Sequence, residues 1–396
     1  TASPTASPTA ALAEGPNIEA GDRHPVPACE DGGMAQDPAQ TDPARTDPAQ
    51  TDNEPPTAAQ VIADTQALLD PYPRRRLATL PTPLQPCERL SEALGGPEIW
   101  VKRDDCTGLA LGGNKVRKLE YLMGQAIAEG ASRVGTFGAL QSNHARQTAA
   151  AANALGLGCE LVLTEMVPRD DHDYVDNGNQ TLFRILGVPT HRVTDDVSSA
   201  AAISAVEEAA AEAGEIVSWI PTGGSSPVGA LGYVNAAIEL VHQAVEAEVG
   251  FHRIVLATST GGTYAGLLAG MDALGAGTAV TGFDTYEGAA RSRAAARTLL
   301  DALGPMLGRN PVAEGSVDIL DGYCGDGYGI PTREATEAIE LFARTEGLLL
   351  DPVYSGKAAA GLIDVVRRGL IGDDERVVFL HTGGAPGLFA YSGEFR

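Results

Sequence analysis

The sequence predicts an α/β fold of two αβα lobes with parallel-type sheets, preceded by a disordered acidic tail. Three observations lead to this prediction. From about residue 98, short apolar segments alternate with helical segments of ten or more residues, which is the pattern of strand–helix–strand units. Glycine-rich turns follow several of the apolar segments, and a low-complexity stretch precedes them all. A chain of 396 residues has room for one large or two ordinary domains.

The first segment, residues 1–60, is dominated by Ala, Pro, Thr and Asp and contains the repeat DPAQTDPARTDPAQTD. Such a composition buries too little apolar surface to offset the entropy lost on ordering. We therefore expect a tail that carries no chemistry, with partner binding as the alternative.

Hydrophobic periodicity and glycine or proline punctuation place the remaining elements. A kinked extended segment with three prolines lies within residues 77–86. The expected helices are 58–69, 116–130, 144–155, 227–247, 263–274 and 358–368, and the expected strands are 98–103, 133–137, 159–164, 216–220, 253–257 and 377–380. We assign 61–124 and 236–396 to a large domain and 125–235 to a small one.

Ligands of open α/β sheets bind outside the carboxyl ends of the strands. That rule selects four loops, which are all rich in glycine and in small hydroxyl or amide residues: 112–115, 138–144, 258–263 and 381–387. Four such loops in one chain indicate a phosphorylated cofactor.

The loop before Lys115 reads GLALGGNK and leads into a helical segment. Gly112 and Gly113 allow a tight turn and a close approach to a ligand, and the lysine then stands at a helix start, where anions are favoured. A desolvated lysine can form an imine with a carbonyl cofactor. We interpret Lys115 as the residue that carries pyridoxal phosphate.

Two other interpretations of this loop remain. Gly108 and Gly113 have the spacing of a nucleotide phosphate loop, but the lysine comes one position late and no hydroxyl residue follows it. The second is a surface lysine that only begins a helix.

The segment TSTGGT, residues 258–263, lies between an apolar strand and a helix. Successive N–H groups in such a turn form an anion site, to which hydroxyls add donors, so we expect a phosphate ester there; an ordinary capped helix is the alternative. There is no G-x-G-x-x-G motif, which disfavours dinucleotides.

Polar residues of the remaining loops are candidates for cofactor and substrate contacts. Asn143 can donate to a phenolate oxygen and the loop amides can hold a carboxylate, although Ser142 or Asn143 could simply cap a helix. Thr382 offers a hydroxyl to a pyridine nitrogen. Tyr328 and Tyr354 lie in glycine-flanked turns and are either proton donors or packing residues.

Composition excludes several classes of function. There are 52 acidic against 28 basic residues, which disfavours nucleic acid or an anionic membrane as a partner. No apolar run is long enough to span a membrane. The five cysteines show neither metal nor disulfide spacing, so we expect no metal and a cytoplasmic location. Acidic excess with only four lysines suggests adaptation to high salt.

The motifs GGNKVRKLEYL, QSNHARQTAAAA, GALGY, LDPVYSGK and HTGG occur in this order. Together they resemble the pyridoxal-phosphate enzymes of the tryptophan-synthase β-subunit fold, also called fold type II. Within that fold the chain is similar to the D-cysteine desulfhydrase and 1-aminocyclopropane-1-carboxylate deaminase family. The similarity runs from about residue 77 to the C-terminus.

The resemblance implies roles for individual residues. Lys115 would bind pyridoxal phosphate as a Schiff base and move the α-proton of the substrate. The large domain would bind the cofactor, and the small one would carry the QSNH loop. Asn143 would bind the phenolic oxygen of the cofactor, and Ser142 with His144 would hold the substrate carboxylate. The phosphate would be bound by Thr260, Gly261, Gly262 and Thr263. Tyr354 and Tyr328 would line the substrate pocket.

Two positions separate the branches of this family. The ring-opening deaminases carry glutamate and leucine where this chain has Ser355 and Thr382. A hydroxyl leaves the pyridine nitrogen nearly neutral, which is sufficient for β-elimination with a good leaving group. The resemblance thus implies a lyase that acts on a small amino acid, D-cysteine, with L-cysteate sulfo-lyase and then the deaminase as alternatives. The alternative from another class is a non-catalytic carrier or regulatory protein that keeps the fold, and the resemblance also implies a homodimer.

Overall fold

The computed structural model describes residues 56–395. The predicted tail therefore lies outside the described residues, apart from its last five positions. Helix α1 (Ala58–Ala67) begins within them, because the Thr57 hydroxyl accepts a hydrogen bond from the amide of Gln60 at 3.2 Å and caps the helix. The helix expected from residue 58 thus begins where it was predicted.

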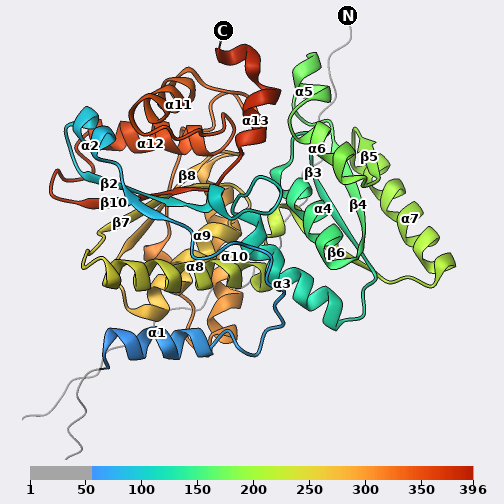
Figure 1. The fold of residues 1–396 in the computed structure, drawn as a ribbon, viewed down its shortest axis with the longest axis horizontal. Helices are drawn as coiled ribbons and strands as arrows, with labels where there is room; N and C mark the ends of the chain where they lie inside the picture. Colours follow the sequence, from blue (N-terminus) through green and yellow to red (C-terminus); the bar gives the residue numbers. More distant parts are fainter. Residues whose placement is uncertain (1–55, 396) are drawn as a thin grey trace, which may run out of the picture. The chain divides into compact units, whose positions relative to one another are not determined.

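A six-stranded sheet forms the larger lobe, with the strand order β1-β2-β10-β7-β8-β9 (Figure 1). Only β1 runs antiparallel to its neighbour; the other pairs are parallel, as expected for strand–helix–strand units. Of these strands, β1, β8 and β9 were not predicted. The bounds are β1 Leu84–Pro86, β2 Glu98–Arg103, β7 Arg253–Thr258, β8 Ala279–Asp284, β9 Asp318–Leu320 and β10 Arg376–His381.

A second sheet of four strands has the order β5-β4-β3-β6, and all its pairs are parallel. Its strands are β3 Arg133–Ala139, β4 Gly158–Thr164, β5 Thr190–Val193 and β6 Val217–Ile220. The predicted fold of two lobes with parallel-type sheets is confirmed. The domain limits of 125–235 stay a prediction.

Helices cover both faces of the larger sheet (Figure 1). Helices α8, α9 and α10 pack on one face and share a core with Val378 and Leu380, while α2, α11 and α12 pack on the other with Val377 and Phe379. The adjacent residues of β10 thus point to opposite faces. The helices are α2 Glu88–Leu94, α3 Lys115–Ala128, α4 Asn143–Leu155, α5 His172–Asp176, α6 Asn179–Leu186, α7 Asp196–Ala213, α8 Pro227–Glu246, α9 Gly262–Leu274, α10 Ala289–Met306, α11 Arg333–Glu346, α12 Ser355–Arg367 and α13 Ala385–Ala390.

A buried network of hydrogen bonds connects helix α3 to the neighbouring elements through Arg117. The guanidinium of Arg117 makes two hydrogen bonds with the Asp104 carboxylate, at 2.8 and 2.9 Å, and two with Glu239 of α8, at 2.9 and 3.0 Å. The ammonium of Lys102 on β2 also donates to Glu239, at 2.5 Å, and Tyr233 donates to Asp104. This network joins α3, α8 and β2 beneath the residue that begins α3, Lys115.

The network makes the free energy of unfolding depend on pH. Burial raises the pKa of Glu239, but the hydrogen bonds and charges of Arg117 and Lys102 outweigh it and lower the pKa from 4.5 to about 2. A carboxyl with a lowered pKa stabilises the fold above its unfolded pKa, and this contribution disappears as the pH falls from about 4.5 towards about 2. The shift corresponds to a free energy on the order of 3 kcal/mol.

We therefore expect Glu239→Gln to have a lower free energy of unfolding than the native protein at neutral pH. Between about pH 5 and about pH 2, where Glu239 takes up its proton, the free energy of unfolding should fall less in the variant than in the native protein. Urea unfolding at several pH values measures this difference. Parallel pH profiles of the two proteins would contradict it.

The described part of the chain contains neither a candidate membrane-spanning helix nor a cluster of side chains suited to a metal ion. None of its helices is long and apolar enough to cross a membrane. Within the same residues, no group of three or more His, Cys, Asp or Glu side chains is placed to hold a metal ion.

Candidate active site

A cavity of about 600 Å³ opens at the carboxyl ends of strands from both sheets. All four of the glycine-rich loops selected from the sequence contribute to its wall. Every predicted site residue lines it: Lys115, Ser142, Asn143, His144, Thr260, Gly261, Gly262, Thr263, Tyr328, Tyr354 and Thr382. The tertiary structure thus brings together residues that are up to 267 positions apart (382 − 115).

Lys115 is the first residue of α3. The turn before it needs glycine, since Gly112 and Gly113 have φ values of 67° and 127°. A Cβ on Gly112 would lie 1.9 Å from the carbonyl oxygen of Asp105, and one on Gly113 would lie 2.4 Å from the side chain of Gln147. Desolvation lowers the Lys115 pKa to about 8, although the Asp351 carboxylate opposes this effect. A usable fraction of free amine therefore exists near neutral pH.

Lys118 is a site residue that the sequence interpretation missed. It lies one turn after Lys115, is buried, and donates to the carbonyl of Gly223 at 3.1 Å and to the hydroxyl of Ser225 at 3.3 Å. Burial, and then the charge of Lys115, lower its pKa well below the ordinary value. The signal was present: the two lysines are three residues apart, which places them on the same face of a helix.

The start of α9 forms a small cradle beside Lys118. Gly261 precedes this helix with a φ of 80°, and the first N–H groups of a helix have no partner within it. A Cβ on Gly262 would lie 2.7 Å from the hydroxyl of Ser225 and 3.0 Å from the ammonium of Lys118. The hydroxyls of Ser225 and Thr260 are 2.7 Å apart. The cradle thus combines N–H donors, hydroxyls and a buried amine that a bound anion would help to protonate, as an anion site requires.

Helix α4 presents its first residues to the cavity. The Ser142 hydroxyl accepts from the amide of Ala145 at 3.1 Å and caps the helix. The side-chain oxygen of Asn143 accepts from Arg146 and from Asn179, both at 3.0 Å. With its oxygen occupied in this way, the NH₂ group of Asn143 is the part left to act as a donor.

His144 has a defined tautomer. Thr136 has one hydroxyl proton, which it donates to the carbonyl of Ile220 at 2.8 Å, so its oxygen accepts from Nε2 of His144 at 2.9 Å. Burial, followed by the charges of Lys115 and Lys118, lowers the His144 pKa well below the ordinary value. The ring is therefore neutral and Nδ1, which is buried and without a hydrogen-bond partner among the described residues, is an acceptor.

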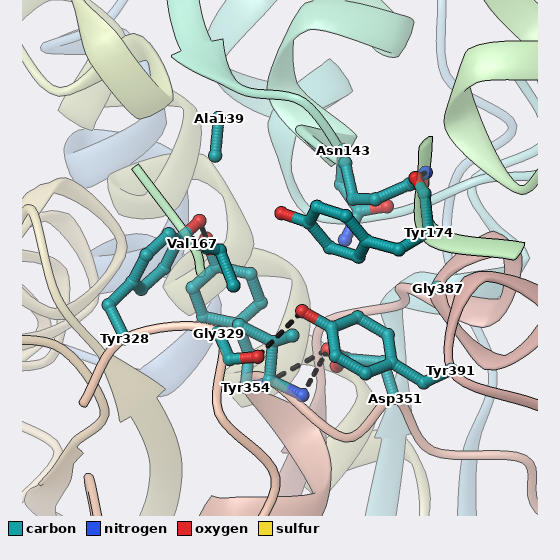
Figure 2. A pocket seen from close by; sticks show the side chains of 12 residues that line it. Ala139, Asn143, Val167, Tyr174, Tyr328, Gly329, Asp351, Tyr354, Gly387 and Tyr391 are labelled. Carbon is teal, nitrogen blue, oxygen red and sulfur yellow. Dashed lines mark hydrogen bonds between the residues drawn. The ribbon is translucent and has the colours of Figure 1, made fainter. Parts of the chain in front are cut away.

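Two tyrosines meet at the other side of the cavity. The hydroxyls of Tyr328 and Tyr354 are 2.5 Å apart, and both rings are shown in Figure 2. Tyr354 is oriented by Asp351, whose carboxylate accepts from the amides of residues 353–355 and from the Ser355 hydroxyl at 2.6 Å. Ser355 is buried in this turn and does not line the cavity, whereas Thr382 does. Of the two residues that distinguish the branches, only Thr382 thus belongs to the cavity wall.

Comparison with known proteins identifies the family. The pyridoxal-phosphate dependent enzyme family matches residues 76–383. The chain belongs to this family.

Relatives and solved structures agree with this assignment. The chain is 41% identical over 320 residues to a D-cysteine desulfhydrase of Salmonella typhi, covering 81% of this chain and 96% of the relative, and 40% identical over 320 residues to one of Salmonella choleraesuis, with the same coverage. A crystal structure of an ACC deaminase homologue superposes with a TM-score of 0.75 at 36% identity, covering 84% of this chain and 98% of the homologue. The processed form of threonine deaminase isoform 2 from Solanum lycopersicum, at 18% identity and a TM-score of 0.55, covers 83% of this chain and 84% of its own and shows the fold alone. The protein is a pyridoxal-phosphate dependent lyase.

The cavity fits this cofactor. The cradle at the start of α9 suits a phosphate, and Lys115 supplies an amine of lowered pKa for the aldehyde. Nδ1 of His144 and the hydroxyl of Thr258 are buried polar atoms of the cavity wall that have no partner among the described residues. Such atoms are expected where a polar ligand belongs.

Proposed function

We propose that the enzyme catalyses the α,β-elimination of D-cysteine. One cysteine and one water give pyruvate, ammonia and hydrogen sulfide: the Cα–H and Cβ–S bonds break, and the released aminoacrylate is hydrolysed. The proposal is carried by the combination of Lys115, the α9 cradle and the tyrosine pair in one cavity of a chain that is 41% identical to a D-cysteine desulfhydrase. When bound, pyridoxal phosphate withdraws electrons from Cα and so lets the α-proton leave.

The residues that would hold the cofactor follow from the donors of the cavity. Lys115 would bind its aldehyde carbon, and the NH₂ group of Asn143 would donate to its phenolic oxygen. Thr260, Gly261, Gly262 and Thr263 would hold the phosphate, with Lys118 as the counter-charge. Thr382 would offer a neutral hydroxyl to the ring nitrogen, which keeps this nitrogen nearly unprotonated.

The substrate carboxylate would lie at the start of α4. A neutral His144 ring, with Nε2–H engaged by Thr136, has no free N–H for a carboxylate. We therefore propose that the contribution of Ser142 and His144 comes through the backbone N–H groups of this helix start. The charge of the carboxylate also favours this place.

The proton leaving Cα would be taken up by the Lys115 amine, whose pKa of about 8 suits proton transfer near neutral pH. Tyr328 and Tyr354 would face the departing sulfur. Burial raises the Tyr328 pKa to about 12, although its bond with Tyr354 opposes this, and burial raises the Tyr354 pKa further. Both hydroxyls are thus protonated, and because one of them donates to the other, the accepting hydroxyl keeps its proton for the leaving group.

The proposal is tested by measuring product release from five compounds. Pyruvate is measured with D-cysteine, L-cysteine, L-cysteate and β-chloro-D-alanine, and α-ketobutyrate with 1-aminocyclopropane-1-carboxylate. We expect D-cysteine to have a kcat/KM at least about tenfold above L-cysteine and L-cysteate, because a chiral pocket with one carboxylate site distinguishes the two enantiomers by a contact worth about 1–3 kcal/mol. β-Chloro-D-alanine has the same configuration as D-cysteine and a good leaving group, so it should also release pyruvate. A preference for L-cysteate would replace sulfide by sulfite as the leaving group. Activity on the cyclopropane alone would overturn the interpretation of Thr382.

Three coarser expectations are part of the same proposal. The enzyme would act in the cytoplasm and as a homodimer. The division into a cofactor-binding large domain and a small domain of residues 125–235 would allow the α4 side of the cavity to approach the tyrosine side around a bound substrate.

A further inference from the structure

The loop that carries Tyr328 is rich in glycine. It connects β9 and α11, and four of its glycines have positive φ angles: 93° at Gly322, 68° at Gly325, 154° at Gly327 and 74° at Gly329. Such a backbone has many accessible conformations. Something outside the loop must therefore hold Tyr328 at 2.5 Å from Tyr354.

Two buried side chains hold the two halves of this loop. The Lys357 ammonium donates to the carbonyls of Cys324 at 2.6 Å and Gly327 at 3.2 Å, before Tyr328. The Tyr391 hydroxyl donates to the carbonyl of Gly329 at 2.7 Å, directly after Tyr328.

Tyr391 is itself firmly placed. Its ring is 1% exposed and contacts Tyr174 edge-on, with the ring centres 5.5 Å apart. The guanidinium of Arg169 lies over its ring at 4.7 Å, and Arg169 in turn pairs with Asp171 and with Glu394. The ring is thus held from two sides by residues of the segment 167–176.

Figure 2 shows the resulting arrangement: Tyr391, Gly329, Tyr328 and Tyr354 surround a second, small pocket that adjoins the main cavity, with Asn143 and Asp351 in the wall of both. Tyr391 does not line the main cavity. The hydrogen bond from Tyr391 to Gly329 connects it to the main cavity through the loop.

We propose that Tyr391 is a positioning residue, whose hydroxyl, through the carbonyl of Gly329, sets the distance between the hydroxyls of Tyr328 and Tyr354. The proposal rests on the proposed role of the tyrosine pair in the elimination. The segment after α13 would thus contribute to the active site, because its Tyr391 side chain holds the part of the loop that follows Tyr328.

Tyr391→Phe removes only the hydroxyl. We expect kcat to fall about tenfold with KM changed less than about twofold, because misplacing a reacting group by a fraction of an ångström costs rate more than binding. The matched control is Tyr72→Phe, which removes the same kind of bond, from a tyrosine hydroxyl to the carbonyl of Met306 at 2.8 Å, in a part of the fold that does not line the cavity. It should leave kcat unchanged.

A double-mutant comparison separates positioning from general destabilisation. If Tyr391 acts only through Tyr328, adding Tyr391→Phe to Tyr328→Phe should lower kcat less than about twofold further. An equal tenfold loss in both backgrounds would overturn the proposal, since the effect would then not pass through Tyr328.

Hydrogen exchange of the loop provides a measurement that does not depend on activity. The amides of residues 325–330 should exchange faster in Tyr391→Phe than in the native enzyme or in Tyr72→Phe, while those of α9 stay unchanged. Unchanged exchange in the loop would refute the positioning role. Faster exchange without any loss of kcat would keep the contact but remove the tyrosine pair from the proposed reaction.

Discussion

Lys115→Ala is expected to abolish the visible absorbance of the bound cofactor and to lower pyruvate release by at least about a thousandfold, since both the attachment and the proton-transferring amine are lost. Lys115 is the first residue of α3 and the amine is desolvated in the cavity, which lowers its pKa to about 8. Absorbance after mixing with pyridoxal phosphate and pyruvate release under the same conditions measure the two effects.

Lys118→Ala is the comparison for this experiment. It removes a second buried lysine one turn away, whose ammonium faces the cradle at the start of α9. We expect the absorbance to remain but to need more cofactor for saturation, because a phosphate counter-charge is lost while the attachment is kept. Pyruvate release retained in Lys115→Ala would show that the attachment point has been assigned to the wrong residue.

Arg117→Met is expected to lower the free energy of unfolding by about 3–5 kcal/mol, because it breaks buried pairs by removing only one side of them. Arg117 is 1% exposed and makes two hydrogen bonds with each of two carboxylates, Asp104 and Glu239. Without it, Asp104 stays buried with hydrogen bonds from Thr82 and Tyr233 but no paired cation. Urea unfolding followed by circular dichroism measures the loss.

Two variants serve as controls for Arg117. Arg117→Lys keeps the charge but cannot make paired bonds with both carboxylates, so its loss of stability should be intermediate. Arg344→Ala removes an exposed ion pair with Glu340 on α11 and should cost less than about 1 kcal/mol. If Arg117→Met were as stable as Arg344→Ala, the network would not be what holds α3 in place.

The main elements of both sheets could be predicted from the sequence because their signals are local. Strand β2 was placed at its observed limits, and α4, α8 and α9 to within one residue at either end. The strands that were missed include β8, β9 and the antiparallel β1, and the last two are only three residues long. Short strands are defined by the neighbour they pair with, which a local pattern does not contain.

In the candidate site, too, some features depend on local sequence and others on contacts between distant residues. The local features could be read from the sequence: a lysine after paired glycines, an anion-binding turn before a helix, and polar residues at strand ends. The tertiary structure places Thr382, and not Ser355, in the cavity wall, and its contacts set the tautomer of His144. It also brought Arg117 to Glu239, 122 residues away, and Tyr391 to Gly329, 62 residues away. Periodicity and turn chemistry act over a few residues, whereas these contacts depend on strand order and helix packing, which are fixed only when the whole chain is folded.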